Sequence, residues 1–169
     1  MRTRAMAISL AIAVAFTGFS ATTASAYDNS DLTISSWTYD TDNCPCTNSS
    51  GLDYTGFQHD AGGTALKLVV KNNGTAVAQV EFHPSDEVLY IYDGANDGDT
   101  IYVRAQWWED GSTPDDATYW VSGTSDELDM NKVQLDGDDD IDENTNVFIK
   151  LYDDRELTDP ITGWYTARS

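Results

Sequence analysis

The 169-residue sequence has little positive charge, since 9 lysines and arginines stand against 29 aspartates and glutamates, for a formal charge of −20. A field of this sign repels phosphate backbones and anionic membranes and attracts basic partners, so we expect no nucleic-acid ligand. Histidine and cysteine are also scarce, with 2 of each. No Gly-x-Ser-x-Gly turn, which presents a catalytic serine in many hydrolases, occurs either. The sequence therefore favours a protein that is not an enzyme.

Long apolar runs are absent after the first 26 residues. In that stretch, Arg2 and Arg4 precede an apolar run at 5–19, and Ala24-Ser25-Ala26 has the small-x-small pattern that a signal peptidase cuts. The run is shorter than the roughly 20 apolar residues that span a bilayer. We expect 1–26 to be a signal peptide and the mature chain to be secreted, extracellular and without a membrane anchor. Without Arg2 and Arg4 the formal charge moves from −20 to −22.

The two cysteines lie two positions apart, at Cys44 and Cys46. Outside the cell such thiols are oxidised, and a bond across Cys44-Pro45-Cys46 closes a very small ring that adds little chain-entropy stabilisation. Two arrangements remain open, a local disulfide clamp within the chain or bonds between two chains. The pattern argues against zinc, because a structural site needs four ligands and no histidine lies near these cysteines.

Residues 27–60 form an N-terminal extension that is rich in small polar residues and shows no sustained periodicity. Within it, residues 32–39 contain β-favouring types, including Trp37 and Tyr39, although the alternation slips. Two interpretations follow. The segment is an edge strand of its own domain or a mobile leader, or it is a strand donated to another protein, with Trp37 and Tyr39 as anchors.

Residues 61–169 have the period-two alternation of antiparallel strands, with no helical period. Leu66, Leu68 and Val70 share one face of the first strand, and Asn73-Gly74 supplies a hairpin turn after it. The pattern predicts an all-β, immunoglobulin-like antiparallel sandwich of about seven strands. Those strands are expected at 65–71, 76–83, 88–92, 100–108, 118–121, 132–135 and 147–152, with a closing edge at 161–165.

The strands at 88–92 and 100–108 are expected to pair as a hairpin. Alternation then turns Leu89, Ile91, Ile101 and Val103 inward, and leaves an aromatic set with one arginine on the outer face. Large aromatic rings beside an arginine are the usual composition of a binding patch. A loop that folds over this face is the alternative interpretation. The predicted outward set is Tyr90, Tyr92, Tyr102, Arg104 and Trp108.

The acidic run at 136–143 indicates a calcium site, because alternating carboxylates direct several oxygens at one hard cation. It is not an EF-hand, since Ile141 stands where that loop needs glycine and Val147 where it needs glutamate. Solvated turn chemistry is the other interpretation. The candidate ligands are Asp136, Asp138, Asp140 and Asp142.

The stretch from Phe82-His83-Pro84 to Tyr90-Ile91-Tyr92-Asp93, followed by Asp97-Gly98 and a valine-containing strand, resembles small secreted β-sandwich proteins of actinobacteria. The overall layout, a signal peptide and polar leader before one sandwich, is similar to the adaptor subunits of actinobacterial umbrella-shaped toxin particles. That resemblance implies a non-enzymatic linker between a lectin-bearing subunit and a toxin scaffold built of repeats. It also implies that the leader inserts into a cleft of the lectin-bearing subunit.

The sequence therefore predicts a secreted adaptor that binds other proteins in a hetero-oligomer and needs no cofactor. A calcium-dependent carbohydrate-binding module that uses the same aromatic face is the second hypothesis. An inhibitor of a secreted hydrolase, with the loop at 109–116 in the target's cleft, is the third.

Overall fold

The computed structural model describes residues 27–96, 100–109, 111, 113–123, 128–137 and 141–169. The predicted signal peptide lies outside these residues. The described chain is all-β, as predicted, apart from two short 3-10 turns at Thr41–Asn43 (η1) and Ser85–Glu87 (η2). Its strands are β1 (Leu32–Asp40), β2 (Cys46–Asn48), β3 (Thr55–Phe57), β4 (Thr64–Asn72), β5 (Thr75–His83), β6 (Val88–Asp93), β7 (Tyr102–Trp107), β8 (Asp115–Trp120), β9 (Asp129–Gln134), β10 (Asn146–Tyr152) and β11 (Tyr165–Arg168).

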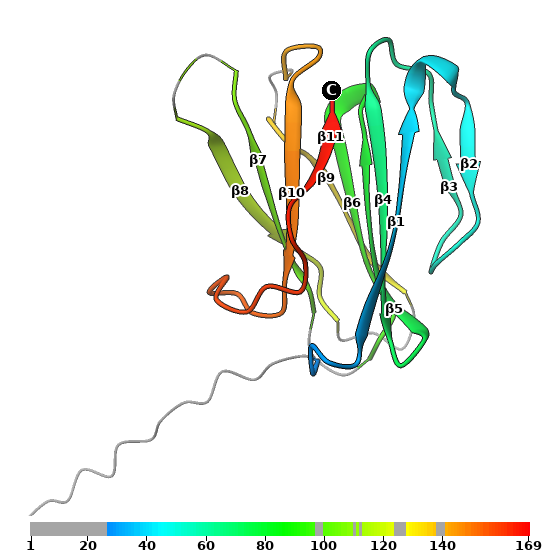
Figure 1. Ribbon diagram of the computed structural model, residues 1–169, viewed down its shortest axis with the longest axis vertical. Helices are drawn as coiled ribbons and strands as arrows, with labels where there is room; N and C mark the ends of the chain where they lie inside the picture. The colour runs from blue at the N-terminus through cyan, green and yellow to red at the C-terminus, as the bar shows by residue number, and fades with distance from the viewer. Residues whose placement is uncertain (1–26, 97–99, 110, 112, 124–127, 138–140) are drawn as a thin grey trace, which may run out of the picture.

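The strands form two packed layers (Figure 1). One layer has the order β8-β7-β10-β11, and the other has the order β1-β4-β5-β6-β9, all antiparallel. A single backbone bridge, Arg168 to Thr64, joins them along one side. The result is a nearly closed, barrel-like sheet that agrees with the predicted sandwich.

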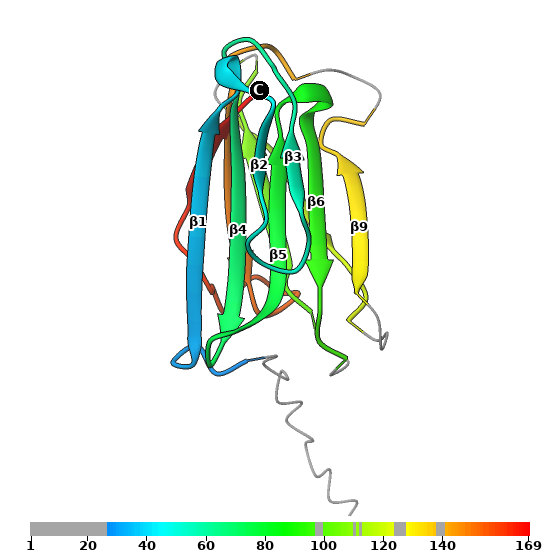
Figure 2. The ribbon, with the colours of Figure 1, turned by 90° about the vertical axis from the view of Figure 1, so that its right-hand side faces the viewer.

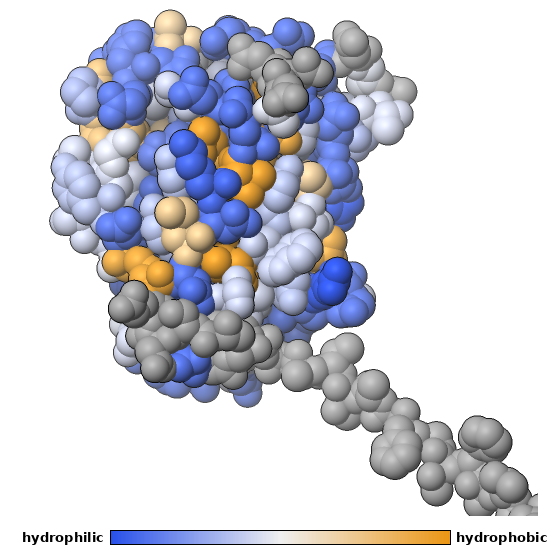
Figure 3. Space-filling model, turned by 180° about the vertical axis from the view of Figure 1, so that it is seen from behind, coloured by the Kyte–Doolittle hydropathy of each residue, from blue (hydrophilic) through white to orange (hydrophobic). Residues whose placement is uncertain are grey.

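The other side of the sandwich is joined by side chains. The Tyr119 hydroxyl on β8 donates to the Leu135 carbonyl at 3.1 Å, and the Asn131 amide on β9 donates to the Trp120 carbonyl at 2.9 Å. Seen from behind (Figure 3), the molecule shows hydrophobic side chains in small groups among hydrophilic ones. Exposed apolar residues near these edges include Leu128 and Met130.

Alternation explains the core between the layers. Leu66, Leu68 and Val70 of β4 point inward, opposite Val103 of β7 and Ile149 of β10, and all are fully buried. The β4–β5 turn is the predicted one, because Asn73 and Gly74 both have positive φ, at 49° and 86°. This is the conformation that a two-residue hairpin turn requires. The sequence therefore fixes which side chains enter the core.

The predicted hairpin between 88–92 and 100–108 is wrong. β6 pairs with β5 and β9, whereas β7 pairs with β8 and β10. The connection between them carries the chain from one layer to the other. Alternation determines which way a side chain faces, but the neighbour of a strand depends on where its connections lead.

The residues expected as an extension, 27–60, contain β1, β2 and β3. β1 pairs with β4 over its full length, from Leu32 opposite Asn72 to Asp40 opposite Thr64. It is thus an edge strand of its own sheet, and the interpretation that this strand is donated to another protein is wrong for this structure. β2 and β3 form a separate two-stranded sheet. We call the segment 46–57 the covering hairpin, because it lies over the outer face of β4, β5 and β6 (Figure 2).

Candidate functional site

The outer face of β8, β7 and β10 brings aromatic and cationic side chains together in registered rows. Tyr102 lies between Trp120 and Tyr152, and the next row places Arg104 between Thr118 and Lys150. Side chains from the 153–164 loop complete the surface. We call this set the aromatic-cationic face and define it as Tyr102, Arg104, Trp108, Trp120, Lys150, Tyr152, Arg155 and Trp164.

Three tryptophans of this face are partly open to solvent. Trp108, Trp120 and Trp164 are 39%, 44% and 43% exposed. Trp120 contacts Tyr102 with ring centroids 6.0 Å apart, and Trp108 meets Phe148 edge-on at 5.4 Å. Half-exposed indoles present a large apolar area with one polar group, which suits a binding surface.

Cations lie over these rings. The Arg155 guanidinium carbon is 5.3 Å from the Trp120 ring centroid, and Arg104 is 5.9 Å from that of Trp164. Lys150 lies 4.9 Å from Tyr152 and 5.8 Å from Trp164. Each such pair contributes on the order of 0.5–1 kcal/mol at an exposed site. The contacts hold the long basic side chains against the sheet.

A bidentate ion pair fixes the centre of the face. The Arg104 Nε donates to Asp116 at 2.9 and 3.1 Å, and Nη2 also bonds that carboxylate. Gln106 donates to it at 3.0 Å. The hydrogen bonds from Arg104, helped by Gln106, hold the pKa of Asp116 below its usual range against the opposing effect of burial. They also raise the pKa of Arg104 above its usual value. Both groups remain charged through ordinary pH.

The charge of this face differs from that of the chain. Residues 27–169 contain seven basic side chains, and three of them, Arg104, Lys150 and Arg155, lie here. Asp116 is the carboxylate that pairs with Arg104. A groove of about 470 Å³, lined by Thr118, Tyr119, Trp120 and Asn131, adjoins the face where β8 meets β9.

Only part of the predicted aromatic set lies on this face. Tyr102, Arg104 and Trp108 do, but placing Tyr90 and Tyr92 beside them was wrong, because β6 belongs to the other layer. Tyr92 is 6% exposed, and burial raises its pKa. The covering hairpin lies over the outer face of β6 (Figure 2), and its Asp53 bonds the Tyr92 side chain, so the alternative interpretation, a loop that folds over this face, holds for β6.

The covering hairpin is attached to the sheet by a run of ring contacts. Phe57 of β3 lies 5.2 Å from Tyr39 and 4.7 Å from His83, and His83 lies 4.9 Å from Tyr90, all between ring centroids. The Tyr39 hydroxyl also accepts a hydrogen bond from Asn48 of β2 at 2.9 Å. Tyr39 therefore anchors the hairpin of its own chain.

Trp37, the other predicted anchor, is half-buried on β1 opposite Lys67. The disulfide between Cys44 and Cys46 forms within the chain, directly before β2. Cys44 packs in the small cluster around Phe57. The local clamp is thus the arrangement in this structure.

Beneath the hairpin lies a buried polar network centred on Lys67 and Glu81. The Lys67 ammonium donates to the Asn48 carbonyl at 3.3 Å, the Asp53 carbonyl at 2.9 Å and the Thr55 hydroxyl at 2.6 Å. It lies 3.6 Å from Glu81. Burial lowers the pKa of Lys67, although the carboxylate of Glu81 opposes the shift.

Glu81 collects the remaining donors of this network. Gln79 donates to it at 2.6 Å, His83 lies 3.0 Å from its second oxygen, and the Thr55 hydroxyl is bonded to it as well. Burial raises the pKa of Glu81, but the bonds from His83 and Thr55 and the charge of Lys67 lower it by more, so the net direction is down. These bonds hold the covering hairpin on the sheet, and they give both the Lys67 ammonium and the Glu81 carboxylate hydrogen-bond partners.

The acidic run is only partly described. Asp138 and Asp140 lie outside the described residues, Asp136 is half-buried and Asp142 is exposed. Burial and repulsion from Asp136 and Asp142 raise the pKa of Glu109, which accepts a hydrogen bond from the Asp142 amide at 3.2 Å. Within the described part of the chain, no group of three or more His, Cys, Asp or Glu residues has metal-binding geometry.

Calcium binding by this run stays a prediction. If the carboxylates hold the ion, millimolar calcium is expected to raise the melting temperature by a few degrees, because a ligand that binds only the folded state stabilises it by mass action. Magnesium at equal concentration is the control, and a second is the Asp136→Asn, Asp142→Asn variant. Equal melting temperatures in calcium and in chelator would contradict the site.

The sequence analysis missed Trp120, Lys150, Tyr152, Arg155 and Trp164. In the strand predicted at 147–152, Phe148, Lys150 and Tyr152 alternate with Val147, Ile149 and Leu151, which indicates that Lys150 and Tyr152 face outward. No sequence pattern indicates that β10 lies next to β7. Comparison with family models, curated proteins and solved structures finds no match for this chain. Among the described residues, no helix has the length and apolar character to cross a membrane.

Proposed function

We propose that the chain is an exported, non-enzymatic protein-binding module that works as an adaptor, with the aromatic-cationic face as its contact surface. The observation that carries this proposal is the gathering of three half-exposed tryptophans and three basic side chains on one sheet face of an acidic protein. Tryptophan, tyrosine and arginine dominate the energetics of protein interfaces.

The cations that lie over the tryptophan rings indicate which kind of partner fits this face. Trp120 and Trp164 already have guanidinium or ammonium groups over them, so a ligand that only stacks on indoles has to displace a cation. A protein surface that offers apolar side chains flanked by carboxylates fits the face without that displacement, and its charges complement the basic groups. The partner is therefore a protein with an apolar patch and acidic rim.

The leader insertion implied by the resemblance to toxin-particle adaptors is not part of this proposal. It requires a free segment at 32–40, and the backbone of that segment is paired with β4. An adaptor function through the sheet face keeps the linking role and leaves the strand in its own sheet.

A capture experiment tests the proposal. Immobilised mature protein is compared with a Trp120→Ser, Trp164→Ser variant against the culture fluid of the producing cells, and captured proteins are identified and mapped by cross-linking. Because truncating a hot-spot residue costs about 2 kcal/mol or more, the double variant is expected to bind at least about 30-fold more weakly. Tyr54→Ser is the matched control, because Tyr54 is a 62% exposed aromatic of the covering hairpin. Equal capture by the double variant would refute the proposal.

A carbohydrate-binding module remains the second candidate, favoured by the exposure of Trp108, Trp120 and Trp164 on one face. A glycan array separates the two. Binding to a glycan that is lost in the Trp120→Ser, Trp164→Ser variant, together with no captured protein, would replace the adaptor proposal with this one.

A further inference from the structure

Tyr27 is held in the fold at its backbone nitrogen. That nitrogen lies 3.1 Å from Oδ2 of Asp153, a residue 126 positions further along the chain. Tyr27 is 6% exposed and belongs to the main core cluster, and Asp153 is 1% exposed at the end of β10. The contact therefore joins two buried groups.

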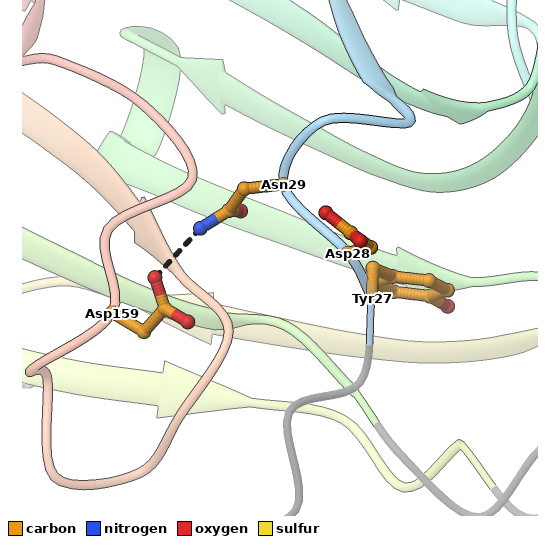
Figure 4. A pocket seen from close by; sticks show the side chains of 4 residues that line it. All are labelled: Tyr27, Asp28, Asn29 and Asp159. Carbon is orange, nitrogen blue, oxygen red and sulfur yellow. Dashed lines mark hydrogen bonds between the residues drawn. The ribbon is translucent and has the colours of Figure 1, made fainter.

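The surroundings of this contact are acidic. Figure 4 shows Tyr27, Asp28 and Asn29 on one side of a pocket of about 480 Å³ and Asp159 on the other, with the Asn29 amide bonded to Asp159 at 2.6 Å. Asp154 accepts hydrogen bonds from the backbone of Thr158 and Asp159 and so fixes the loop that bounds the pocket. Asp153 at the nitrogen and Asp28 and Asp159 at the pocket all carry carboxyl groups.

The sequence predicts that a signal peptidase cuts between Ala26 and Tyr27. In this hydrolysis water adds across the peptide bond, Ala26 leaves as a carboxylate, and the Tyr27 amide becomes an amine that takes up a proton at neutral pH. An uncharged N–H donor beside Asp153 thereby becomes an ammonium group with three donors.

We propose that removal of residues 1–26 creates a buried ion pair between the α-ammonium of Tyr27 and Asp153, so that processing itself strengthens the fold. The amide already donates to the carboxylate of Asp153, so cleavage adds a full positive charge beside it. The attraction between two opposite charges is stronger in a buried site than in water. Cleavage at the Tyr27 nitrogen thus raises the free energy of unfolding of the domain.

The test compares two forms of the chain 27–169 at pH 7. One has a free α-amine, and the other carries an Nα-acetyl group, which restores the amide N–H without adding a residue. The free amine is expected to melt about 3 °C higher, since a gain of 1 kcal/mol raises the melting temperature by about 2–4 °C in a domain of this size. With Asp153→Asn in both forms, the difference is expected to vanish. Equal melting temperatures, or a difference that persists with Asp153→Asn, would overturn the proposal.

A second measurement does not require the variant to fold. The pKa of the α-amine, followed by amine-labelling rates in the native protein, is expected above the ordinary value of about 7.7–8.0. Because the pKa is raised in the folded state, the stabilisation is complete below that ordinary value and is lost as pH rises through the folded one. A pKa at or below the ordinary range would contradict the ion pair. So would an N-terminal sequence of the secreted protein that does not begin at Tyr27.

Discussion

Replacing Glu81 by alanine is expected to lower the free energy of unfolding by about 3–5 kcal/mol, the usual cost of removing one partner from a buried ion pair. Glu81 is 2% exposed and Lys67 is fully buried. Without the carboxylate, Lys67 keeps only neutral acceptors, and Thr55 and Gln79 lose the group that they bond. Urea denaturation at pH 7 gives the change.

Three variants show whether the pair itself is responsible. Glu81→Gln keeps the volume and removes the charge, so it should cost less than alanine. Lys67→Met combined with Glu81→Leu removes both charges, and such replacements are often neutral, so the double variant should recover much of the loss. Glu156→Ala, at an exposed position, should change stability by no more than about 0.5 kcal/mol. A loss below about 1 kcal/mol for Glu81→Ala would contradict the role given to the network.

The same carboxylate gives a pH signature. Its pKa is lowered in the folded state from the ordinary 4.5, so the unfolded chain takes up the proton first as pH falls. The stabilisation is therefore complete above that ordinary value and is lost as pH falls through the folded one. Relative to Glu81→Gln, the unmodified protein should lose more stability between about pH 5 and pH 3.

Replacing Phe57 by alanine is expected to cost about 3–5 kcal/mol, as for other large-to-small changes in cores. Phe57 is fully buried and packs with Cys44 and Ala65 as well as Tyr39 and His83. β2 and β3 have only three residues each, too few to hold the covering hairpin by backbone pairing alone. The ring therefore provides most of its attachment.

Hydrogen exchange separates this effect from a general loss of stability. Amides of β2 and β3 should lose protection in Phe57→Ala, while those of β7 and β10 keep theirs. Tyr54→Ala is the control, because it removes an exposed ring from the same hairpin. Uniform loss of protection in both layers would mean that the hairpin is not a separate cooperative unit.

The sequence predicted the strands well and their neighbours poorly. Period-two alternation placed the strands at 65–71, 76–83 and 147–152 close to their observed bounds, because burial on one face imposes that pattern. Lys67 shows what alternation cannot predict, namely whether an outward side chain is covered by another segment. It alternates like an outward residue, and its side chain does point away from the core, but a segment about 12–20 positions earlier covers it. Strands of three residues leave no periodic trace, so the covering hairpin was not predictable.

The candidate site was predictable only in part for a related reason. Tyr102 and Lys150 were each recognisable as outward-facing, but the paired residues of β7 and β10 are 42 to 50 positions apart in the chain, and β8 and β9 lie between the two strands. Strand partners over such intervals are chosen by the packing of the whole sandwich rather than by local pattern. The signal peptide at 1–26, by contrast, is drawn from a purely local pattern and stays a prediction.

The candidate contact surface and the buried ion pair lie in different layers of the sandwich. The aromatic-cationic face belongs to the layer of β8, β7, β10 and the loop that follows, whereas the Lys67–Glu81 pair and its cover belong to the layer of β4 and β5, and no residue is shared. Energetic effects at separate sites with no common partners add nearly independently. Substitutions in the proposed contact surface of the first layer are therefore expected to leave unchanged the stability that the buried ion pair gives to the second.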